Sequence, residues 1–114
     1  MKNKDLDLGK TSTGIQPNVA ALLSYVFGFV TGIIFYLIEK ENKFVRFHAM
    51  QSMLVFGFFF LLNIILPVIP IIGWVLLPLV WIASFVLWII LMIKAYQGER
   101  LKLPLAGEIA EKNS

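Results

Sequence analysis

The stretch that decides the fold is residues 49–93, AMQSMLVFGFFFLLNIILPVIPIIGWVLLPLVWIASFVLWIILMI, which has no charged side chain in 45 positions. A second uncharged run, VAALLSYVFGFVTGIIFYLI, covers residues 19–38. A charged side chain at the centre of a bilayer costs roughly 2.5–3.5 kcal/mol on insertion scales. The absence of charge from both runs therefore predicts segments that lie in a membrane.

The rest of the composition agrees with this interpretation. Of the 114 residues, 59% are hydrophobic, and the mean hydropathy is +0.82. The ten Lys and Arg and the seven Asp and Glu all fall in residues 1–18, 39–48 and 94–114. A soluble chain this short needs polar atoms over most of its surface. The composition therefore excludes a soluble globular domain, and the lack of cysteine excludes disulfides and thiolate metal sites.

The lengths of the two runs predict three transmembrane helices. At about 1.5 Å per residue, residues 19–38 cover roughly 30 Å, which is one hydrocarbon thickness. Residues 49–93 are too long for one span and suit two, at about 49–66 and 74–93. The turn between them is expected near Pro67–Gly73, because proline interrupts a helix and glycine frees the backbone.

The expected fold class is an all-α integral membrane protein, because backbone groups in lipid must be paired within the segment. The first helix is followed by a basic cytosolic loop, and the other two form a helical hairpin with a Pro/Gly turn. The transmembrane domain, residues 19–93, lies between a flexible polar tail at 1–18 and a polar C-terminal tail at 94–114.

The positive charges predict an orientation in the plasma membrane. Three spans place the N-terminus and the C-terminus on opposite sides. The side with the first loop and the C-terminus has six basic residues near helix ends: Lys40, Lys43, Arg46, Lys94, Arg100 and Lys102. The other side has Lys4 and Lys10. The positive-inside rule therefore favours an outside N-terminus and a cytoplasmic C-terminus. Anionic headgroups already explain these charges, so no nucleic-acid partner is expected.

Small residues recur at every fourth position of the first run: Ala20, Ser24, Gly28 and Gly32. Residues four apart share a helix face, and small side chains let another helix approach closely. Three interpretations follow. The face packs inside one protomer, which we favour, or it forms the seam of a dimer. Alternatively, the two glycines break the helix and create a re-entrant element.

A polar patch is expected at the mouth of the second span. His48 opens this span, and Gln51 and Ser52 follow it three and four residues later on the same face. Arg46 points elsewhere, toward lipid phosphates, and Asn63 falls near the patch face at the far end of the helix. Polar side chains of this kind more often form hydrogen bonds between helices than line a transport path. A role of His48 as a ligand or proton relay is the less favoured alternative.

The sequence has no motif for catalysis or for a cofactor. It lacks a nucleophile with its base, a phosphate loop and a pair of carboxylates inside the membrane. A single histidine without cysteine is a poor metal site. We therefore expect a protein that is not an enzyme and holds no cofactor. Its expected partners are the lipid bilayer and either a second copy or another membrane protein.

Several motifs together resemble a known family. They are NVAALLSY at 18–25, GIIF at 32–35, EKENKFVRFHAMQS at 39–52, KAYQGE at 94–99 and LPLAGE at 103–108. This pattern resembles uncharacterised small prokaryotic membrane proteins that are grouped with the Tic20-like proteins, relatives of a chloroplast inner-envelope import component. The resemblance covers roughly residues 12–112. It implies a polytopic plasma-membrane protein, and the plastid relatives are thought to help proteins cross a membrane.

Two functional interpretations follow from the residues and the resemblance. The favoured one is a structural or accessory component of the membrane. The alternative, which the Tic20-like kinship implies, is an oligomeric subunit of a protein-translocation or channel assembly.

Overall fold

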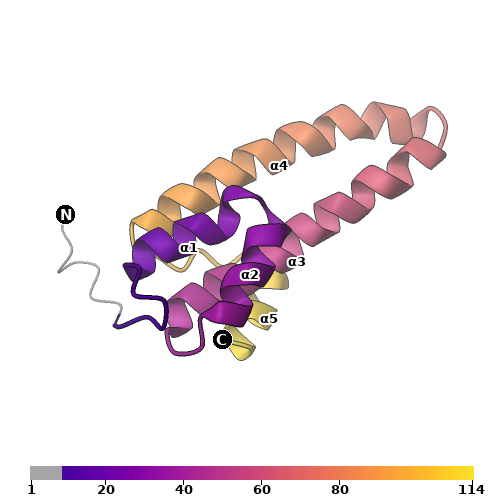
Figure 1. Cartoon of the computed structure of the whole chain (residues 1–114). Helices are drawn as coiled ribbons and strands as arrows, with labels where there is room; N and C mark the ends of the chain where they lie inside the picture. Colours follow the sequence, from indigo (N-terminus) through magenta and orange to yellow (C-terminus); the bar gives the residue numbers. More distant parts are fainter. Residues whose placement is uncertain (1–8) are drawn as a thin grey trace.

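The computed structural model describes residues 9–114, and this part of the chain is helical without a strand (Figure 1). The helices in chain order are α1 (Pro17–Val26), α2 (Phe29–Ile38), α3 (Lys43–Ile65), the short 3-10 helix η2 (Leu66–Val68), α4 (Ile72–Tyr96) and α5 (Ala106–Lys112). The all-α fold class predicted from the sequence is therefore confirmed for the described residues.

Helices α3 and α4 form a long hairpin. With η2 included, α3 covers Lys43–Val68, and both this segment and α4 are long and apolar enough to cross a membrane. The turn falls within the predicted 67–73 segment. It needs Gly73, because a Cβ at this position would collide with the backbone oxygen of Leu66. A glycine therefore lets the two long helices join through a tight, charge-free turn.

Both long helices extend beyond their predicted limits at the charged end of the molecule. Helix α3 starts at Lys43 instead of at 49, because the Asn42 side chain accepts a hydrogen bond from Val45 N at 3.0 Å and caps the helix. Helix α4 continues to Tyr96 instead of ending at 93. Only residues 39–42 remain as the loop between α2 and α3.

The first uncharged run does not form the single helix that its length predicts. Helix α1 ends at Val26 and α2 begins at Phe29, with Gly28 between them at φ 62° and ψ −132°. The chain then turns back, and the two ends of the α1–α2 pair meet. Ser12 N, just before α1, donates to the Glu39 carboxylate, just after α2, at 2.8 Å. Each helix has 10 residues, or about 15 Å, so the first run forms a short helical hairpin instead of one long helix.

The break is stable in an apolar environment because its backbone groups find partners. Gly28 N donates to Tyr25 O at 3.0 Å, and the Trp88 indole on α4 donates to the same oxygen at 2.6 Å. The Ser52 hydroxyl on α3 donates to Gly28 O at 2.8 Å. Non-helical backbone at membrane depth is tolerated where protein groups satisfy it in this way. The break therefore depends on two helices that lie far away in the sequence.

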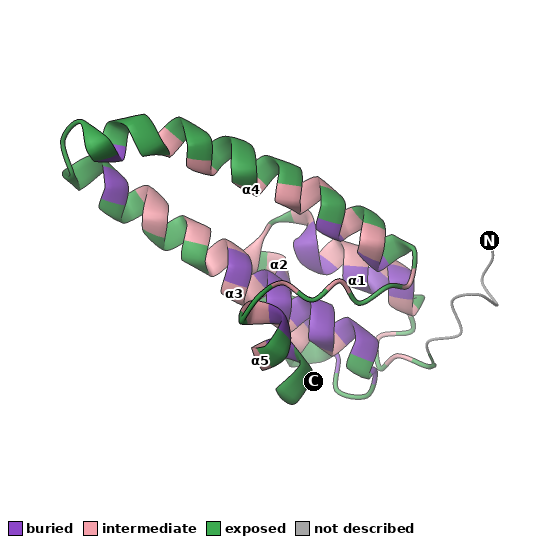
Figure 2. Ribbon diagram, turned by 180° about the vertical axis from the view of Figure 1, so that it is seen from behind, coloured by how far each residue is buried: buried purple, intermediate pink, exposed green. Residues whose placement is uncertain are grey.

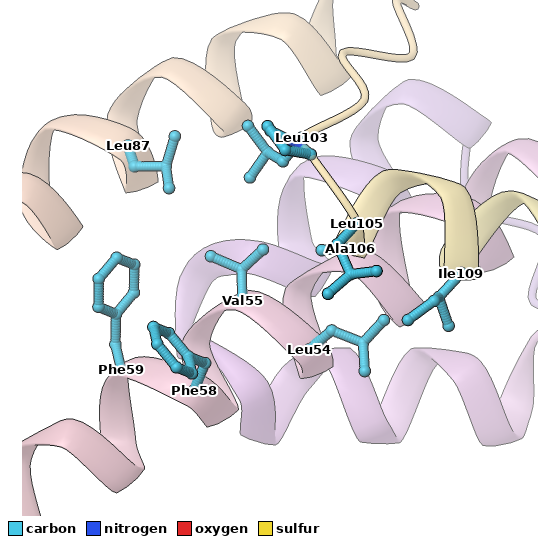
Figure 3. A pocket seen from close by; sticks show the side chains of 10 residues that line it. Leu54, Val55, Phe58, Phe59, Leu87, Leu103, Leu105, Ala106 and Ile109 are labelled. Atoms are coloured by element: carbon cyan, nitrogen blue, oxygen red, sulfur yellow. The ribbon is translucent and has the colours of Figure 1, made fainter.

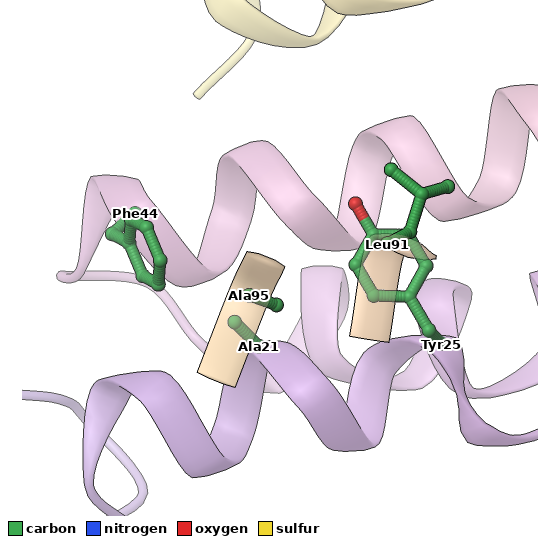
Figure 4. Packing of buried hydrophobic residues seen from close by; sticks show 5 residues of the cluster. All are labelled: Ala21, Tyr25, Phe44, Leu91 and Ala95. Atoms are coloured by element: carbon green, nitrogen blue, oxygen red, sulfur yellow. The ribbon is translucent and has the colours of Figure 1, made fainter. Parts of the chain in front are cut away.

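Helix α1 packs between α3 and α4 at the charged end of the molecule. Figure 4 shows Ala21 and Tyr25 of α1 meeting Phe44 of α3 and Leu91 and Ala95 of α4. The two alanines allow α1 and α4 to approach closely. A second cluster holds both α1 and α2 to α3: Ala20, Phe35, Val45 and Ala49. The core therefore lies where α1 and α2 are, and not along the whole hairpin.

Burial changes along the long axis of the molecule. Figure 2 shows buried residues gathered in α1 and in the first half of α3, on which Gly32 and Phe35 of α2 are also buried, whereas the distant half of the hairpin is mostly exposed. Large apolar side chains cover this exposed part, for example Val68 at 77% and Trp81 at 62% exposure. Such a surface requires lipid or another apolar partner.

The described N-terminal and C-terminal segments lie at the same end of the molecule. The Asn18 amide donates to Tyr96 O at 3.1 Å, and the Tyr36 hydroxyl donates to Asn113 O at 2.7 Å. The sequence predicted termini at opposite ends of a three-span protein, and the structure differs because the α1–α2 pair returns the chain to the end of the molecule at which α1 begins. Residues 1–8 of the predicted tail lie outside the described residues.

Candidate functional site

Three buried side chains from two helices form one hydrogen-bonded group, the polar core network: Tyr25 of α1 with His48 and Gln51 of α3. The Tyr25 hydroxyl lies 2.7 Å from His48 Nδ1, and Gln51 Nε2 donates to the Tyr25 oxygen at 3.1 Å. All three side chains are fully buried. The sequence-predicted pair of His48 and Gln51 is thus brought together by a tyrosine that the sequence analysis did not select.

The polar core network binds the backbone of the segment between α4 and α5, residues 97–105, which we call the C-terminal strap. His48 Nε2 lies 2.9 Å from Glu99 O. Gln51 Nε2 donates to Leu101 O, and its Oε1 accepts from Leu103 N, both at 2.9 Å. The hydrogen bonds from these two side chains therefore fix the position of the strap along α3.

The partners fix the direction of each hydrogen bond. A backbone carbonyl only accepts, so His48 Nε2 carries the proton that it donates to Glu99 O. His48 Nδ1 then accepts from the Tyr25 hydroxyl, whose oxygen in turn accepts from Gln51. Every N–H and O–H of these three side chains has an acceptor. The arrangement suits a structural connection between helices and strap better than proton transfer to a substrate.

Arg46 does not point toward lipid phosphates as predicted. Its Nη1 donates to Tyr36 O at 3.0 Å and to Glu39 O at 2.8 Å, and its guanidinium lies 4.0 Å from the centre of the Tyr36 ring. The last carbonyls of a helix lack intrahelical donors and carry partial negative charge. Arg46 satisfies these carbonyls at the end of α2, and it thereby ties α2 to α3.

The other two predicted members of the patch lie elsewhere. Ser52 donates to Gly28 O at the α1–α2 break. Asn63 is far along α3, where its Nδ2 donates to Phe59 O of the same helix and its Oδ1 accepts from the Trp81 indole on α4. The five predicted residues thus divide into four separate connections, because each polar group bonds to the backbone or side chain nearest to it.

The small residues of the first run pack inside one protomer. Ala20 is buried in the cluster with α3, and Ser24 is buried with its hydroxyl on Ala21 O at 2.6 Å. A Cβ on Gly32 would lie 2.8 Å from Ala49 O of α3. These contacts lie within one chain. The helix breaks at Gly28, whereas Gly32 lies inside α2 and faces α3. The dimer seam stays a prediction.

Glu39 holds the described N-terminal segment against the loop between α2 and α3. Its carboxylate accepts from Ser12 N, from the Ser12 hydroxyl, and from Glu41 N and Asn42 N, at 2.8–3.0 Å. Burial raises the pKa of Glu39, but the hydrogen bonds from these donors outweigh it and hold the pKa below its ordinary value of 4.5. We call this arrangement the Glu39 latch.

The Glu39 latch is expected to make stability depend on pH. Because the pKa of Glu39 is lower in the folded chain, the latch contributes fully above pH 4.5 and is lost as the pH falls through the lowered pKa. Glu39→Gln should cost about 1–3 kcal/mol at neutral pH and remove this acid-dependent part of stability. Thermal unfolding in detergent from pH 7 to pH 3 measures both effects. Glu41→Gln, at an exposed neighbour, is the control, and an equal loss in that variant would contradict the latch.

An apolar groove of about 370 Å³ lies between α3, α4 and the end of the chain (Figure 3). Its lining comes from three regions: Leu54, Val55, Phe58 and Phe59 of α3, Leu87 of α4, and Leu103, Pro104, Leu105, Ala106 and Ile109. None of these side chains is polar, so the groove can hold only an apolar group.

The arrangement offers no obvious metal centre. Within residues 9–114, no three His, Asp or Glu side chains lie close enough together to hold a metal ion. The functional residues that the sequence analysis missed are Tyr25, Trp88 and the strap carbonyls. Tyr25 had one signal, since a tyrosine deep in an apolar run needs a hydrogen-bond partner.

Comparison with known proteins agrees with the membrane fold. A family model described as the magnetosome magnetite crystal formation protein family matches residues 13–110. A UPF0132 membrane protein of Methanocaldococcus jannaschii is 54% identical over 107 residues, which are 94% of this chain and 96% of the relative. A UPF0132 membrane protein of Archaeoglobus fulgidus is 49% identical over 98 residues, 86% of this chain and 95% of the relative.

These matches support the resemblance to a family of small membrane proteins. The kinship with Tic20-like proteins is not shown by them and stays a prediction. No solved structure matches the chain. The names of the relatives and the two long apolar helices together identify an all-helical membrane protein. Because the family model matches most of the chain, the protein belongs to the magnetosome magnetite crystal formation protein family.

Proposed function

We propose that the protein is a small structural or accessory component of the membrane and that it carries out no catalysis. The polar core network is the observation that carries this proposal. His48, Tyr25 and Gln51 are fully buried polar side chains, and their hydrogen bonds are directed at each other and at the C-terminal strap. They hold the fold together and leave its outer surface to act on the membrane.

The arrangement in the membrane follows from the same geometry. We propose that α3 and α4 are the two spans and that the α1–α2 pair enters and leaves on one side. All charged residues within 9–114 lie at that end, and the turn at 67–73 has none. The positive-inside rule then places this end, with both described termini, in the cytosol and the apolar turn on the opposite side of the plasma membrane.

Single cysteines test this topology, because the natural sequence contains none. Gln16→Cys, Lys40→Cys and Lys112→Cys place a thiol on exposed residues of the charged end, and Val68→Cys places one in the turn. In intact cells and in inside-out vesicles, a membrane-impermeant maleimide should label the first three variants from the cytosolic side and Val68→Cys from the other. A three-span protein would instead show Gln16→Cys and Lys40→Cys on opposite sides. Labelling of Val68→Cys from neither side would contradict the two spans.

The description of the family refers to the formation of magnetite crystals. For this chain we propose that it shapes or organises the bilayer, which is a role that a membrane protein can have in such a process. Direct coordination of iron is disfavoured, because the described residues offer no cluster of His, Asp and Glu side chains. Lipid is the proposed principal partner, and the exposed apolar side chains of α4 leave room for a second copy or another membrane protein.

The second candidate function is a subunit of a channel or translocation assembly. A wide groove between α3 and α4 supports it, because Asn63, Trp81 and Ser84 place polar groups there among aromatic rings. Reconstituted liposomes separate the two candidates. We expect the purified protein to leave ion and peptide permeability at the protein-free level. Sustained flux that His48→Ala alters would contradict the accessory role and support the second candidate.

A further inference from the structure

The protein is much thicker at one end than at the other. The charged end contains α1, α2 and α5 together with parts of α3 and α4, whereas the distant half consists of α3 and α4 alone (Figures 1 and 2). Burial follows the same division, since Tyr25, Phe44 and Phe47 at the thick end are almost fully buried and Val68 and Ile71 in the turn are exposed.

The thick part reaches past the middle of the hairpin. At the tip of the α1–α2 pair, a Cβ on Gly28 would contact Phe56, and the Phe29 and Phe60 rings lie 5.1 Å apart. Phe56 and Phe60 lie 13 and 17 residues from the start of α3, or about 20 Å and about 26 Å along a helix of about 35 Å. In the proposed two-span topology, α1 and α2 therefore lie mainly in one leaflet of the bilayer that α3 and α4 cross.

The extra area in that leaflet is large for so small a protein. A helix with side chains is about 10–12 Å wide, so two added helices displace roughly 200 Å² of lipid in one leaflet. Helix α5 lies at the same end, and its charged residues Glu108, Glu111 and Lys112 favour a position at the headgroups. The polar core network and Arg46 connect the added helices to α3 through directional hydrogen bonds.

We propose that this asymmetry makes the protein a curvature-selective membrane wedge, which accumulates in strongly curved bilayers with α1, α2 and α5 in the convex leaflet. Bending expands the convex leaflet relative to the concave one, and a body with more cross-section in the convex leaflet relieves the resulting strain. Binding of one-sided elements to membranes is sensitive to curvature for this reason. The inference rests on the proposed structural role and specifies what that role acts on.

Vesicles of different diameter test the proposal with the unmodified fold. The Lys40→Cys variant, labelled with a fluorophore, is reconstituted into phosphatidylcholine and phosphatidylglycerol vesicles, tethered to a surface and imaged one by one. An impermeant quencher of the fluorophore separates molecules with the thick end outward from those with it inward. From about 200 nm to about 40 nm diameter, the surface density of outward molecules should rise about twofold or more. The density of inward molecules should fall over the same range.

The opposite signs of the two orientations are the internal control, since size-dependent errors in reconstitution affect both orientations alike. Densities that do not depend on diameter, or enrichment of the inward molecules in small vesicles, would overturn the proposal. The same vesicles report permeability. Leaky vesicles would reject the accessory role itself, whereas tight vesicles without a dependence on diameter would reject only the curvature inference.

Discussion

Replacing Gly32 with leucine is expected to separate α2 from α3 and to destabilise the protein by about 3 kcal/mol or more. Even the first added carbon would lie 2.8 Å from Ala49 O, 3.0 Å from Ser52 Cβ and 3.1 Å from Met53 N. Two of these neighbours are backbone atoms of α3, which cannot move without bending the helix. Unfolding by increasing mole fractions of sodium dodecyl sulfate, followed by tryptophan fluorescence, measures the loss.

Gly57 supplies the matched control for the Gly32 variant. It lies on α3, and a Cβ there would meet nothing within 4 Å. Gly57→Ala should therefore be neutral or stabilise the helix by up to about 1 kcal/mol, whereas Gly32→Ala should already destabilise the fold. Equal effects of the two alanine variants would contradict close packing of α2 on α3. Such a result would instead indicate that Gly32 lies on the outer surface of the protein, where two copies can pack against each other.

The sequence predicted the membrane character and the α3–α4 hairpin but not the path of residues 19–38. Twenty uncharged residues match one hydrocarbon thickness, and length alone cannot distinguish one span from two short helices that turn back. The break depends on Trp88 and Ser52, which satisfy the carbonyls of Tyr25 and Gly28 from other helices. Those contacts exist only after the helices have packed. The two glycines therefore made a helix break one possible interpretation, but the sequence alone could not distinguish it from a continuous helix.

The candidate site was only partly predictable, again because the partners of its side chains come from distant parts of the chain. The i, i+3 spacing of His48 and Gln51 places both on one face of α3, and this part of the patch is present. Their partners are the Tyr25 hydroxyl and three backbone groups of the strap. Backbone groups leave no signature in the residue types of a sequence. A polar side chain in an apolar helix thus indicates that a partner exists, but the tertiary fold selects which one.

The two halves of the hairpin are held by different kinds of contact, which explains where polar residues are found. Near the charged end, buried polar side chains connect α1, α2 and the strap to α3, and each connection replaces water that the apolar surroundings exclude. In the distant half, two indoles of α4 make the polar links across the hairpin that the structure shows: Trp81 donates to Asn63, and Trp74 donates to Pro67 O. The thick end is therefore specified by directional bonds, and the thin end is left to contacts with lipid.

Replacing Gln51 with leucine is expected to detach the C-terminal strap and to cost about 2–4 kcal/mol, because it leaves the half-buried Leu101 O and Leu103 N without their partner. The change also leaves the Tyr25 oxygen without its donor. Detachment of the strap removes one wall of the apolar groove, since Leu103 belongs to its lining. Hydrogen–deuterium exchange should show faster exchange at the Leu103 amide and throughout α5, while amides in the distant half of the hairpin keep their protection.

Ser84→Ala is the matched control for the Gln51 variant. The Ser84 hydroxyl donates only to Trp81 O of its own helix and is exposed, so its loss should change stability by no more than about 0.5 kcal/mol. Tyr25→Phe gives an independent check on the same network, because it removes one hydroxyl that joins Gln51 to His48. If the strap exchanged no faster in Gln51→Leu than in Ser84→Ala, the polar core network would not be what holds it. Docking of α5 would then depend on apolar contacts alone, and Ile109→Ser, in the groove lining, should release the strap instead.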